Sequence, residues 1–278
     1  MKEAAAHHFL TSDGVRVAYY IDDFTDPWRK AQAVVLTHSA MSSAHRMYQF
    51  VPHLSRRFRV VRMDTRGHGA SGIPDPALEL SLPRLTQDVL ELVDHLCIDK
   101  AHFLGVAAGG YLSQHMAMGH PDRVLSAVLV ASKPGLKHSA ALSWLPQIKE
   151  KGLRAFLAET ISDRFPEGTP QAQIDWFLDE VGKNDLAYVS RFITHMAGLY
   201  WMDEVHRIQC PTLIIAPGDE PIGNFDAYEE MRDLVKDSEL LVYEGGRHNL
   251  GDYLGDRCAE DALAFWDRRF PKVVAPGG

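Results

Sequence analysis

The chain has 278 residues, enough for one large domain or two modest ones. Hydrophobic residues make up 46% and charged residues 24%, a composition that excludes a disordered or fibrous protein. Lysine and arginine number 29 against 37 for aspartate and glutamate, a net charge of −8, so we expect neither nucleic acid nor a membrane surface as a partner.

The sequence favours a cytoplasmic location. No apolar run approaches the ~20 residues that a membrane-spanning helix needs. The segment at the start, MKEAAAHHFLTS, contains no apolar stretch of signal-peptide length. Cys97, Cys210 and Cys258 are far apart and odd in number, which indicates free thiols in a reducing compartment.

Short apolar runs alternate with helical patterns along much of the chain. Runs rich in β-branched residues predict strands, and apolar residues spaced three or four apart predict helices. The expected strands span 15–21, 33–37, 59–64, 101–106, 126–131, 212–216 and 240–243, and the expected helices 83–96, 107–118 and 252–268. This alternation predicts an α/β protein with a mostly parallel central sheet and helices on both faces.

The segment over 134–206 breaks the alternation, because it shows helical periodicity and no strand. An all-helical insertion between two parallel strands predicts a cap, or lid, over the carboxyl edge of the sheet, where such sheets bind ligands. A helical layer without a gating role is the alternative. We therefore predict a core over 1–133 and 207–278 and a helical cap over 134–206.

The segment FLGVAAGGYLS, residues 103–113, carries the most chemical information. Gly105, Gly109 and Gly110 would let a strand reverse into a helix with almost no loop, leaving Ala107 exposed and strained at the turn. This is the spacing of the nucleophile elbow G-x-S-x-G, with alanine in the place of serine. A dinucleotide-binding fingerprint is also rich in glycine, but it requires a different spacing and a later acidic residue.

With this segment the chain resembles the α/β-hydrolase superfamily in its capped, single-domain form. Three other segments carry the resemblance over essentially the whole chain. THSA at 37–40 is similar to the H-G-x oxyanion turn, DTRGHGAS at 64–71 to D-x-R-G-x-G-x-S, and HPDRV at 120–124 to the segment after the elbow helix. The resemblance implies the α/β-hydrolase fold with an all-helical cap, and a serine-type hydrolase.

The family's chain order of nucleophile, acid and histidine implies a catalytic triad in this sequence. Ala107 occupies the nucleophile position. The segment APGDEPI resembles one whose carboxylate precedes the proline, which favours Glu220 over Asp219 as the acid. Some relatives place the acid after the preceding strand, where ASK at 131–133 offers no carboxylate. The segment EGGRHN then supplies His248 as the general base.

The resemblance also implies an oxyanion hole formed by the backbone N–H groups of Ala40 and Ala108, each worth about 3 kcal/mol to the transition state. His38 and His68 are expected to fix turns, although either could border the pocket. Cap aromatics could line an apolar pocket or form the core of the cap, and three arginines could bind a substrate carboxylate or lie in solvent. These candidates are Trp144, Trp176, Phe177, Tyr200 and Trp201, with Arg154, Arg164 and Arg191.

The alanine at 107 leaves three interpretations open. In the favoured one, the nucleophile of a serine hydrolase is replaced, so the chain is inactive or impaired and a bound ligand survives. In the second, His248 and Glu220 act as a base without covalent catalysis, as a carbon–carbon hydrolase or a cofactor-free dioxygenase or lyase would. In the third, the protein is a ligand-binding relative of hydrolases.

The expected substrate is an ester, lactone or amide of a small, partly apolar metabolite. Haloalkane dehalogenases and epoxide hydrolases of this fold use an aspartate at the elbow, and Asn249 after the histidine is unlike the carbon–carbon hydrolases. The resemblance therefore favours esterases and enol-lactone hydrolases. No His, Cys or Asp cluster has ligand spacing, so we expect no metal and no organic cofactor. A monomer and a homodimer are equally compatible with the sequence.

Overall fold

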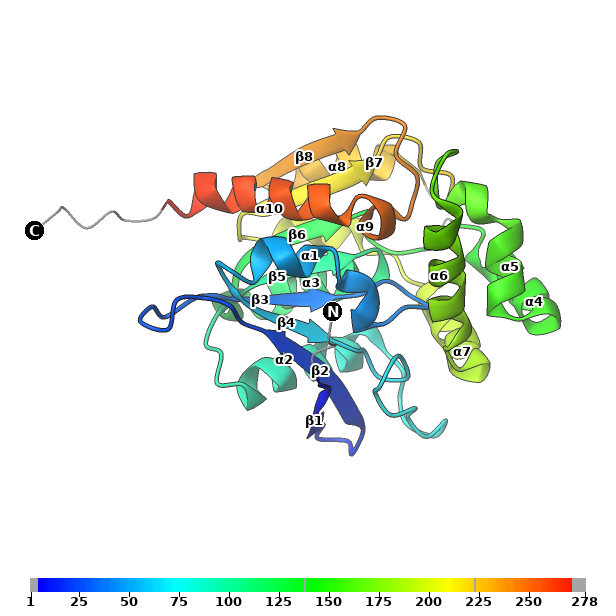
Figure 1. The fold of residues 1–278 in the computed structure, drawn as a ribbon, viewed down its shortest axis with the longest axis horizontal. Coiled ribbons are helices and arrows are strands. Elements are labelled where there is room, and N and C mark those ends of the chain that lie inside the picture. The colour runs from blue at the N-terminus through cyan, green and yellow to red at the C-terminus, as the bar shows by residue number, and fades with distance from the viewer. Residues whose placement is uncertain (1–4, 138, 223, 272–278) are drawn as a thin grey trace, which may run out of the picture.

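The computed structural model of this protein describes residues 5–137, 139–222 and 224–271 (Figure 1). Within these residues, eight strands form one sheet in the order β1-β2-β4-β3-β5-β6-β7-β8. The first two strand pairs of this order are antiparallel and the remaining five are parallel. The strands are β1 (His7–Leu10), β2 (Arg16–Asp22), β3 (Ala33–Thr37), β4 (Arg59–Met63), β5 (Ala101–Val106), β6 (Val124–Val130), β7 (Thr212–Pro217) and β8 (Ser238–Tyr243).

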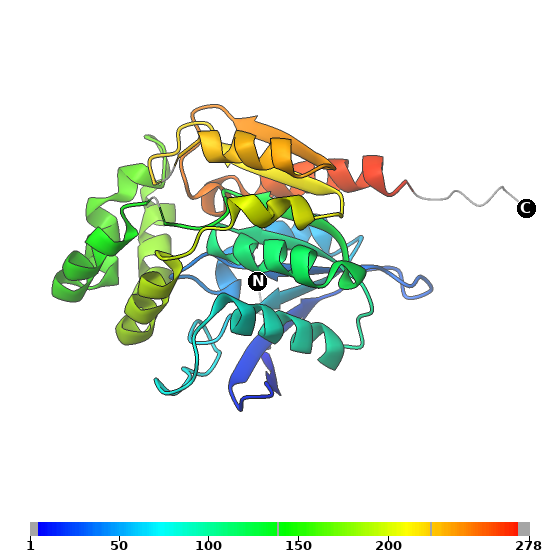
Figure 2. The ribbon, with the colours of Figure 1, turned by 180° about the vertical axis from the view of Figure 1, so that it is seen from behind.

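Helices cover both faces of the sheet, as predicted. In Figure 1, α1 (Phe50–Leu54) and α10 (Gly255–Arg269) lie over the face turned to the viewer. Figure 2 shows α2 (Leu82–His95), α3 (Ala108–Gly119) and α8 (Asp226–Leu234) over the opposite face. Among the helices of the described residues, none is both long and apolar enough to cross a membrane.

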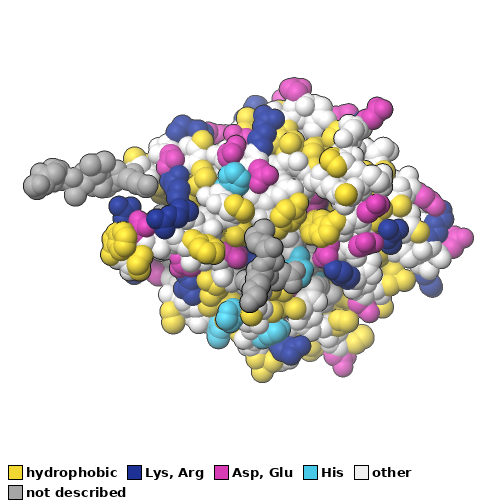
Figure 3. Space-filling model, in the orientation of Figure 1, with side chains coloured by type: hydrophobic (Ala, Val, Ile, Leu, Met, Phe, Trp, Pro, Cys, Tyr) yellow, Lys and Arg dark blue, Asp and Glu magenta, His cyan; other side chains and the backbone are white. Residues whose placement is uncertain are grey.

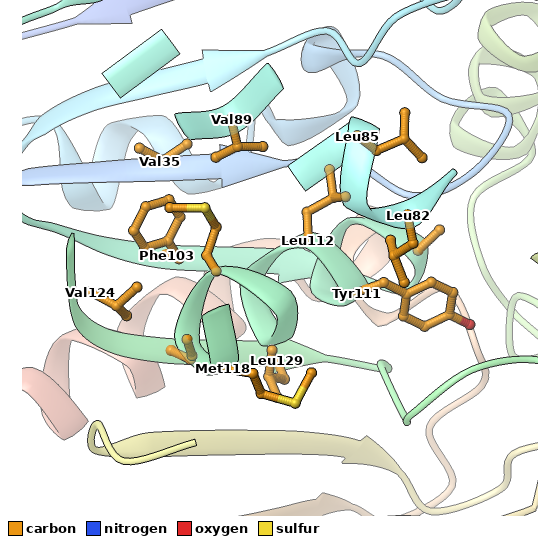
Figure 4. Close-up of a cluster of buried hydrophobic side chains, with 14 of the residues drawn as sticks. Val35, Leu82, Leu85, Val89, Phe103, Tyr111, Leu112, Met118, Val124 and Leu129 are labelled. Atoms are coloured by element: carbon orange, nitrogen blue, oxygen red, sulfur yellow. The ribbon is translucent and has the colours of Figure 1, made fainter. Parts of the chain in front are cut away.

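The strand β3 shows why both faces carry helices. Its side chains are all buried, and successive side chains of a strand point to opposite faces. Val35 belongs to the cluster of α2 and α3, close to Val89 and Leu112 (Figure 4). Val34 and Leu36 belong to the cluster of α1 and α10 instead. A strand that is buried at every position therefore needs a helical layer on each side.

The ends of several elements differ from the prediction. The strand β1 was not predicted, because its sequence HHFL is too short and polar to show alternation. The expected helix over 252–268 is two helices, α9 (Leu250–Tyr253) and α10, since the backbone leaves the helical region at Leu254. The other expected strands and helices are present, with ends that move by two residues or fewer.

The chain between β6 and β7 forms four α-helices within its described residues, beyond the carboxyl ends of the parallel strands (Figures 1 and 2). They are α4 (Ala141–Lys151), α5 (Leu153–Glu159), α6 (Gln171–Gly182) and α7 (Leu186–Met196). A short 3-10 helix, η3 (Ile161–Asp163), lies between α5 and α6. The cap helices share a hydrophobic cluster of their own that contains Ile148, Phe156 and Phe177. Only α7 also contributes side chains to the main core, among them Phe192 and Met196.

The surface carries mixed charge on the face in view. Figure 3 shows lysine and arginine side chains lying among aspartate and glutamate side chains on this face. Many of them pair, for example Arg57 with Asp267 and Arg268 with Glu239. Such exposed pairs contribute little to stability, so the fold depends on the two clusters that sandwich the sheet.

Candidate active site

Ala107 lies at the sharp turn between β5 and α3, where its backbone has φ 48° and ψ −115°. This left-handed conformation is unfavourable for any residue with a side chain, at a cost of roughly 1–3 kcal/mol. Hydrogen bonds hold it there: the Ala107 N–H donates to the Val130 carbonyl at 2.8 Å, and the Gly110 N–H donates to the Ala107 carbonyl at 2.9 Å. The turn therefore has the strained geometry expected of a nucleophile elbow.

The glycines around Ala107 are required by close packing. A β-carbon on Gly109 would overlap the carbonyl of Thr37, and one on Gly105 would overlap the backbone of Gly110. A β-carbon on Gly110 would overlap the side chain of Ser132. The helix α3 can therefore begin directly against β3 and β5, which places its N-terminal N–H groups at the edge of the sheet.

His248 and Glu220 form a hydrogen-bonded pair across the loops that follow β8 and β7. The His248 Nδ1 lies 2.8 Å from Glu220 Oε2 and 3.1 Å from Oε1. The Glu220 carboxylate is fully buried and accepts two further hydrogen bonds, from the Tyr228 hydroxyl at 3.0 Å and the Ile222 N–H at 2.9 Å. An ionised carboxylate only accepts, so His248 carries its proton on Nδ1 and leaves Nε2 able to take another.

The charges around Glu220 keep it ionised. Burial alone would raise the pKa of Glu220, but the charge and hydrogen bond of His248, followed by the charge of Lys133, lower it to about 2. Asp219, the second candidate for the acid, instead pairs with Arg247 at the surface. The structure therefore brings Glu220, and not Asp219, to His248.

Lys133 follows β6 and was not predicted as part of the site. Its Nζ atom is buried and has no hydrogen-bond partner within the described residues. Burial lowers the pKa of Lys133 below its ordinary value, and the charge of Glu220 offsets only part of this effect. The segment ASK at 131–133 could have indicated that Lys133 belongs to the site, because this lysine stands where some relatives place the triad acid.

The loop of His248 lies against the elbow. Gly251, three residues after His248, packs so closely on Val106 that a β-carbon there would meet its side chain. Val106 directly precedes Ala107, and Leu250 belongs to the same buried cluster as Val106. The segments that carry the predicted nucleophile position, acid and base therefore meet at one edge of the sheet.

The predicted oxyanion turn lies beside the same edge. Ala40 and Ala108 line a void of about 10 Å³, and within the described residues neither of their N–H groups donates to a protein acceptor. His38 fixes this turn, because its Nδ1–H donates to the Ser39 carbonyl at 2.7 Å and its Nε2 accepts from the Thr65 N–H at 3.0 Å. Burial lowers the pKa of His38 to about 4, which keeps the imidazole neutral.

A cavity of about 60 Å³ lies between the cap and the core, beside His248. Its walls come from the oxyanion turn, from the short 3-10 helix η1 (Ala44–Met47), from the cap and from the loops after β7 and β8. The lining residues are Ser39, Ala40, Met41, Arg46, Trp144, Leu157, Arg164, Phe177, Val181, Ile222, His248 and Asn249. Of the tryptophans predicted as pocket candidates, Trp144 is the one that the structure places in this wall.

Two of the other predicted pocket residues belong to packed interfaces instead. The Trp201 Nε1–H donates to Gln114 Oε1 at 2.9 Å, and its ring packs edge-on against Tyr111 at 5.0 Å between centroids. The Arg191 guanidinium donates to the backbone carbonyl of Leu78. These two predictions are corrected, because both side chains contact the core and neither lines the cavity.

Trp176 and Tyr200 are also corrected. The Trp176 ring packs edge-on against Tyr48, with 5.1 Å between centroids, in a surface groove of about 820 Å³ between α6 and α1. This groove is larger than the cavity, but neither His248 nor Glu220 lines it. Tyr200 is 41% exposed and forms an isolated β-bridge with Gly135 where the chain enters and leaves the cap.

Two buried arginines line the cavity, and one of them, Arg46, was missed as a site residue. Arg164 was a candidate either for binding a substrate carboxylate or for lying in solvent, and it is only 4% exposed. Arg46 is also 4% exposed and pairs with Asp252. No local pattern could have revealed Arg46 or chosen between the two alternatives for Arg164, because a lone arginine in a polar segment looks the same whether it faces solvent or a cavity.

The site can bind a carbonyl compound and move a proton, but it has no nucleophile at 107. The imidazole of His248 can accept a proton, and the N–H groups of Ala40 and Ala108 can stabilise an oxyanion. The described residues contain no cluster of three or more His, Cys, Asp or Glu side chains arranged to hold a metal ion.

Comparisons with known proteins agree with this fold. The sequence model of the α/β hydrolase fold family matches residues 32–166. The chain is 27% identical over 220 residues to 3-oxoadipate enol-lactonase 2 of Acinetobacter baylyi, covering 76% of this chain and 80% of the relative. It is 27% identical over 278 residues to a non-heme chloroperoxidase of Streptomyces lividans, covering 92% of this chain and 97% of the relative.

Solved structures extend the likeness to nearly the whole chain. A hydrolase from Pseudomonas aeruginosa superposes with a TM-score of 0.82 at 26% identity, covering 94% of this chain and 97% of the other. The enol-lactonase from Burkholderia xenovorans superposes with a TM-score of 0.85 at 21% identity, covering 93% and 99%. These likenesses confirm the predicted fold class.

Proposed function

This chain belongs to the α/β-hydrolase superfamily, and we propose that it carries the site of a serine-type hydrolase for an ester or lactone of a small metabolite, with Ala107 in place of the nucleophile. One observation carries the proposal: the strained elbow at Ala107, the His248–Glu220 pair and the turn of Ala40 lie at one edge of the sheet, and residue 107 lacks only a hydroxyl. Relatives named as enol-lactonases and as a putative carbamate hydrolase support a hydrolase acting on a carbonyl group.

The chain as it stands binds its substrate but forms no acyl-enzyme. A methyl group cannot attack a carbonyl, whereas a serine hydroxyl at 107 could do so with help from His248. Nε2 of His248 would take the hydroxyl proton, and Glu220 would stabilise the resulting imidazolium. The N–H groups of Ala40 and Ala108 would stabilise the oxyanion.

The cap acts as a lid in this proposal. The cavity of about 60 Å³ is far smaller than the ~300–1,000 Å³ of ordinary ligand pockets, so a substrate enters only when the cap moves. The hydrophobic cluster of the cap supports this role, because it joins α4, α5 and α6 to one another and to α7, and of these helices only α7 also contributes to the main core.

The variant Ala107→Ser tests the proposal. We expect it to hydrolyse p-nitrophenyl acetate or the lactone dihydrocoumarin at least ~10³-fold faster than the parent chain, since triad members together supply factors of this order or greater. The control is Ala107→Ser combined with His248→Gln, which keeps the hydroxyl and removes its base. If the parent already turns over its substrate and serine adds nothing, the covalent mechanism is wrong.

A second candidate is a base-catalysed reaction by His248 and Glu220 without a covalent intermediate. Three hydrogen-bond donors and the buried Lys133 surround Glu220 and keep its carboxylate ionised beside His248. This arrangement favours base catalysis over simple ligand binding, because binding alone does not require an ionised carboxylate paired with a histidine. This candidate predicts that His248→Gln abolishes a parent activity that Ala107→Ser leaves unchanged. Oxygen uptake with a heteroaromatic substrate would identify a dioxygenase, and ligand binding without any turnover would leave a binding protein.

A further inference from the structure

Arg164 is a buried cation without a counterion in the wall of the candidate active site. It follows the short helix η3, and its side chain is 4% exposed. Its carbonyl accepts a hydrogen bond from the Asn249 N–H at 3.1 Å, directly after His248 in the chain. The cap residue Arg164 and the catalytic loop are therefore joined, and both line the cavity of about 60 Å³.

The guanidinium of Arg164 is only partly used by the protein. Its Nη1 donates to the carbonyl and the hydroxyl of Thr160, at 2.9 Å and 2.8 Å. Its Nε and Nη2 have no hydrogen-bond partner among the described residues, and no described carboxylate lies within ion-pair distance of it. The carbon atom Cζ of the same guanidinium lies 5.9 Å from the ring centre of Trp144.

Arg46 lies in the same cavity wall, and its guanidinium is paired within the protein. Its Nε and Nη2 donate to the two oxygens of Asp252, and its Nη1 donates to the Met41 carbonyl. Arg46 therefore uses three of its five N–H donors within the protein, and Asp252 supplies its counterion. Glu220, the buried carboxylate of the site, is occupied by His248 and by two other donors, so it does not neutralise Arg164.

A buried charge without a partner is costly, and a fold retains one where a ligand supplies the opposite charge. We propose that Arg164 binds a carboxylate of the substrate through Nε and Nη2, so that the site takes a small molecule with a carboxylate at one end and an ester or lactone carbonyl at the other. Two parallel N–H donors match the two oxygens of a carboxylate. This inference rests on the proposed function, because it takes the cavity beside His248 as the substrate site.

Burial lowers the pKa of Arg164 to about 10, although Asp163 and Glu220 oppose this effect. The side chain therefore stays charged at neutral pH while it lacks a protein counterion. Arg164 is thus a specificity-determining residue, and its expected effect is on which ester binds rather than on how fast a bound carbonyl reacts.

Two esters of equal length test the proposal by calorimetry on the parent chain. Monomethyl glutarate carries one carboxylate and one ester, and dimethyl glutarate replaces the carboxylate with a second ester. We expect the parent to bind the monoanion about tenfold to a hundredfold more tightly, the range of charge-assisted hydrogen bonds. Arg164→Gln should lose this preference, and Arg164→Lys should keep part of it.

The matched control is Arg154→Gln, since Arg154 is an exposed cap arginine that pairs with Asp179 at the surface. It should bind both esters as the parent does. Equal binding of the two esters by the parent, or a preference that persists in Arg164→Gln, overturns the proposal. If Arg164→Gln does not fold, the parent's preference and the Arg164→Lys variant decide the question.

The same two esters separate this inference from the proposed function. In the Ala107→Ser background, methanol release measures hydrolysis, and we expect kcat/KM to favour the monoanion, with the preference lost in Ala107→Ser/Arg164→Gln. Binding of the monoanion without any hydrolysis in Ala107→Ser would refute the proposed function and leave the carboxylate site standing. Hydrolysis of both esters at equal kcat/KM would refute the carboxylate site and leave the proposed function standing.

Discussion

Arg46 and Asp252, 206 positions apart in the chain, form a two-point ion pair in the interior. The Nε–Oδ1 and Nη2–Oδ2 distances are 2.8 Å and 2.6 Å, and both side chains are buried. Arg46 also donates to the carbonyl of Met41, next to the predicted oxyanion turn, and Asp252 accepts from Asn249, next to His248. One ion pair therefore connects the turn that would bind the oxyanion to the loop that carries the proposed base.

Replacing Asp252 by asparagine should destabilise the protein by roughly 3–5 kcal/mol, because it leaves the Arg46 cation buried without a counterion. Urea unfolding followed by circular dichroism measures this loss. The control Asp179→Asn removes the exposed partner of Arg154 and should cost less than ~1 kcal/mol. Similar losses in the two variants would show that the buried pair has no special role.

Replacing each of two glycines of α3 by alanine should change the stability of the protein in opposite directions. In Gly109→Ala the new β-carbon overlaps the Thr37 carbonyl, so we expect a loss of several kcal/mol or failure to fold. Gly119→Ala places its β-carbon in open space at the exposed end of the helix and should stabilise the protein by up to ~1 kcal/mol. Thermal unfolding of both variants checks the pair, and equal melting temperatures would contradict the packing argument.

Glu220 should contribute stability that depends on pH. Its pKa in the folded protein, about 2, is below the ordinary 4.5, so folding favours its ionised form. That contribution is present above pH 4.5 and is lost as the pH falls from 4.5 through about 2.

The free energies of unfolding of the parent and of Glu220→Gln should therefore differ by a constant amount at neutral pH. The difference should narrow below pH 4.5, and urea unfolding at a series of pH values measures it. Other carboxylates titrate in both chains and cancel. A difference that stays constant down to the lowest pH at which both chains fold would contradict this origin of the shift.

Lys133→Met should stabilise the protein, although it removes a charge that Glu220 attracts. The pKa of Lys133 is lowered by burial, so folding disfavours its charged form, and this penalty disappears only as the pH rises toward the ordinary 10.5. Removing a buried ammonium without a hydrogen bond should add about 1–3 kcal/mol at neutral pH.

The same variant should raise the pKa of Glu220, because Lys133 helps to lower it. The pH-dependent part of the stability should then be lost at a higher pH than in the parent. The control is Lys137→Met, since Lys137 is exposed, and it should change neither quantity. A destabilised Lys133→Met chain would show that the ammonium is better solvated than its burial indicates.

The sequence by itself determined the α/β architecture and the segments that meet at the site. The strand β3 begins with four successive apolar residues, and such a strand is stable only between two helical layers, so the sandwich could be predicted locally. The elbow could also be predicted from its glycines. A β-carbon at Gly105, Gly109 or Gly110 would overlap neighbouring atoms, so only glycine fits at these positions. These features are visible as local sequence patterns, although the contacts that require them join distant segments.

Only the tertiary structure decided which side chains face the cavity beside His248. Trp144, Trp176 and Trp201 look alike in the sequence, yet only Trp144 lines the cavity, while the others pack at the groove and against α3. Helical periodicity identifies an apolar face but not the surface that it meets. The burial of Arg164 and the pairing of Arg46 were hidden for the same reason, since each depends on segments brought together only when the chain folds.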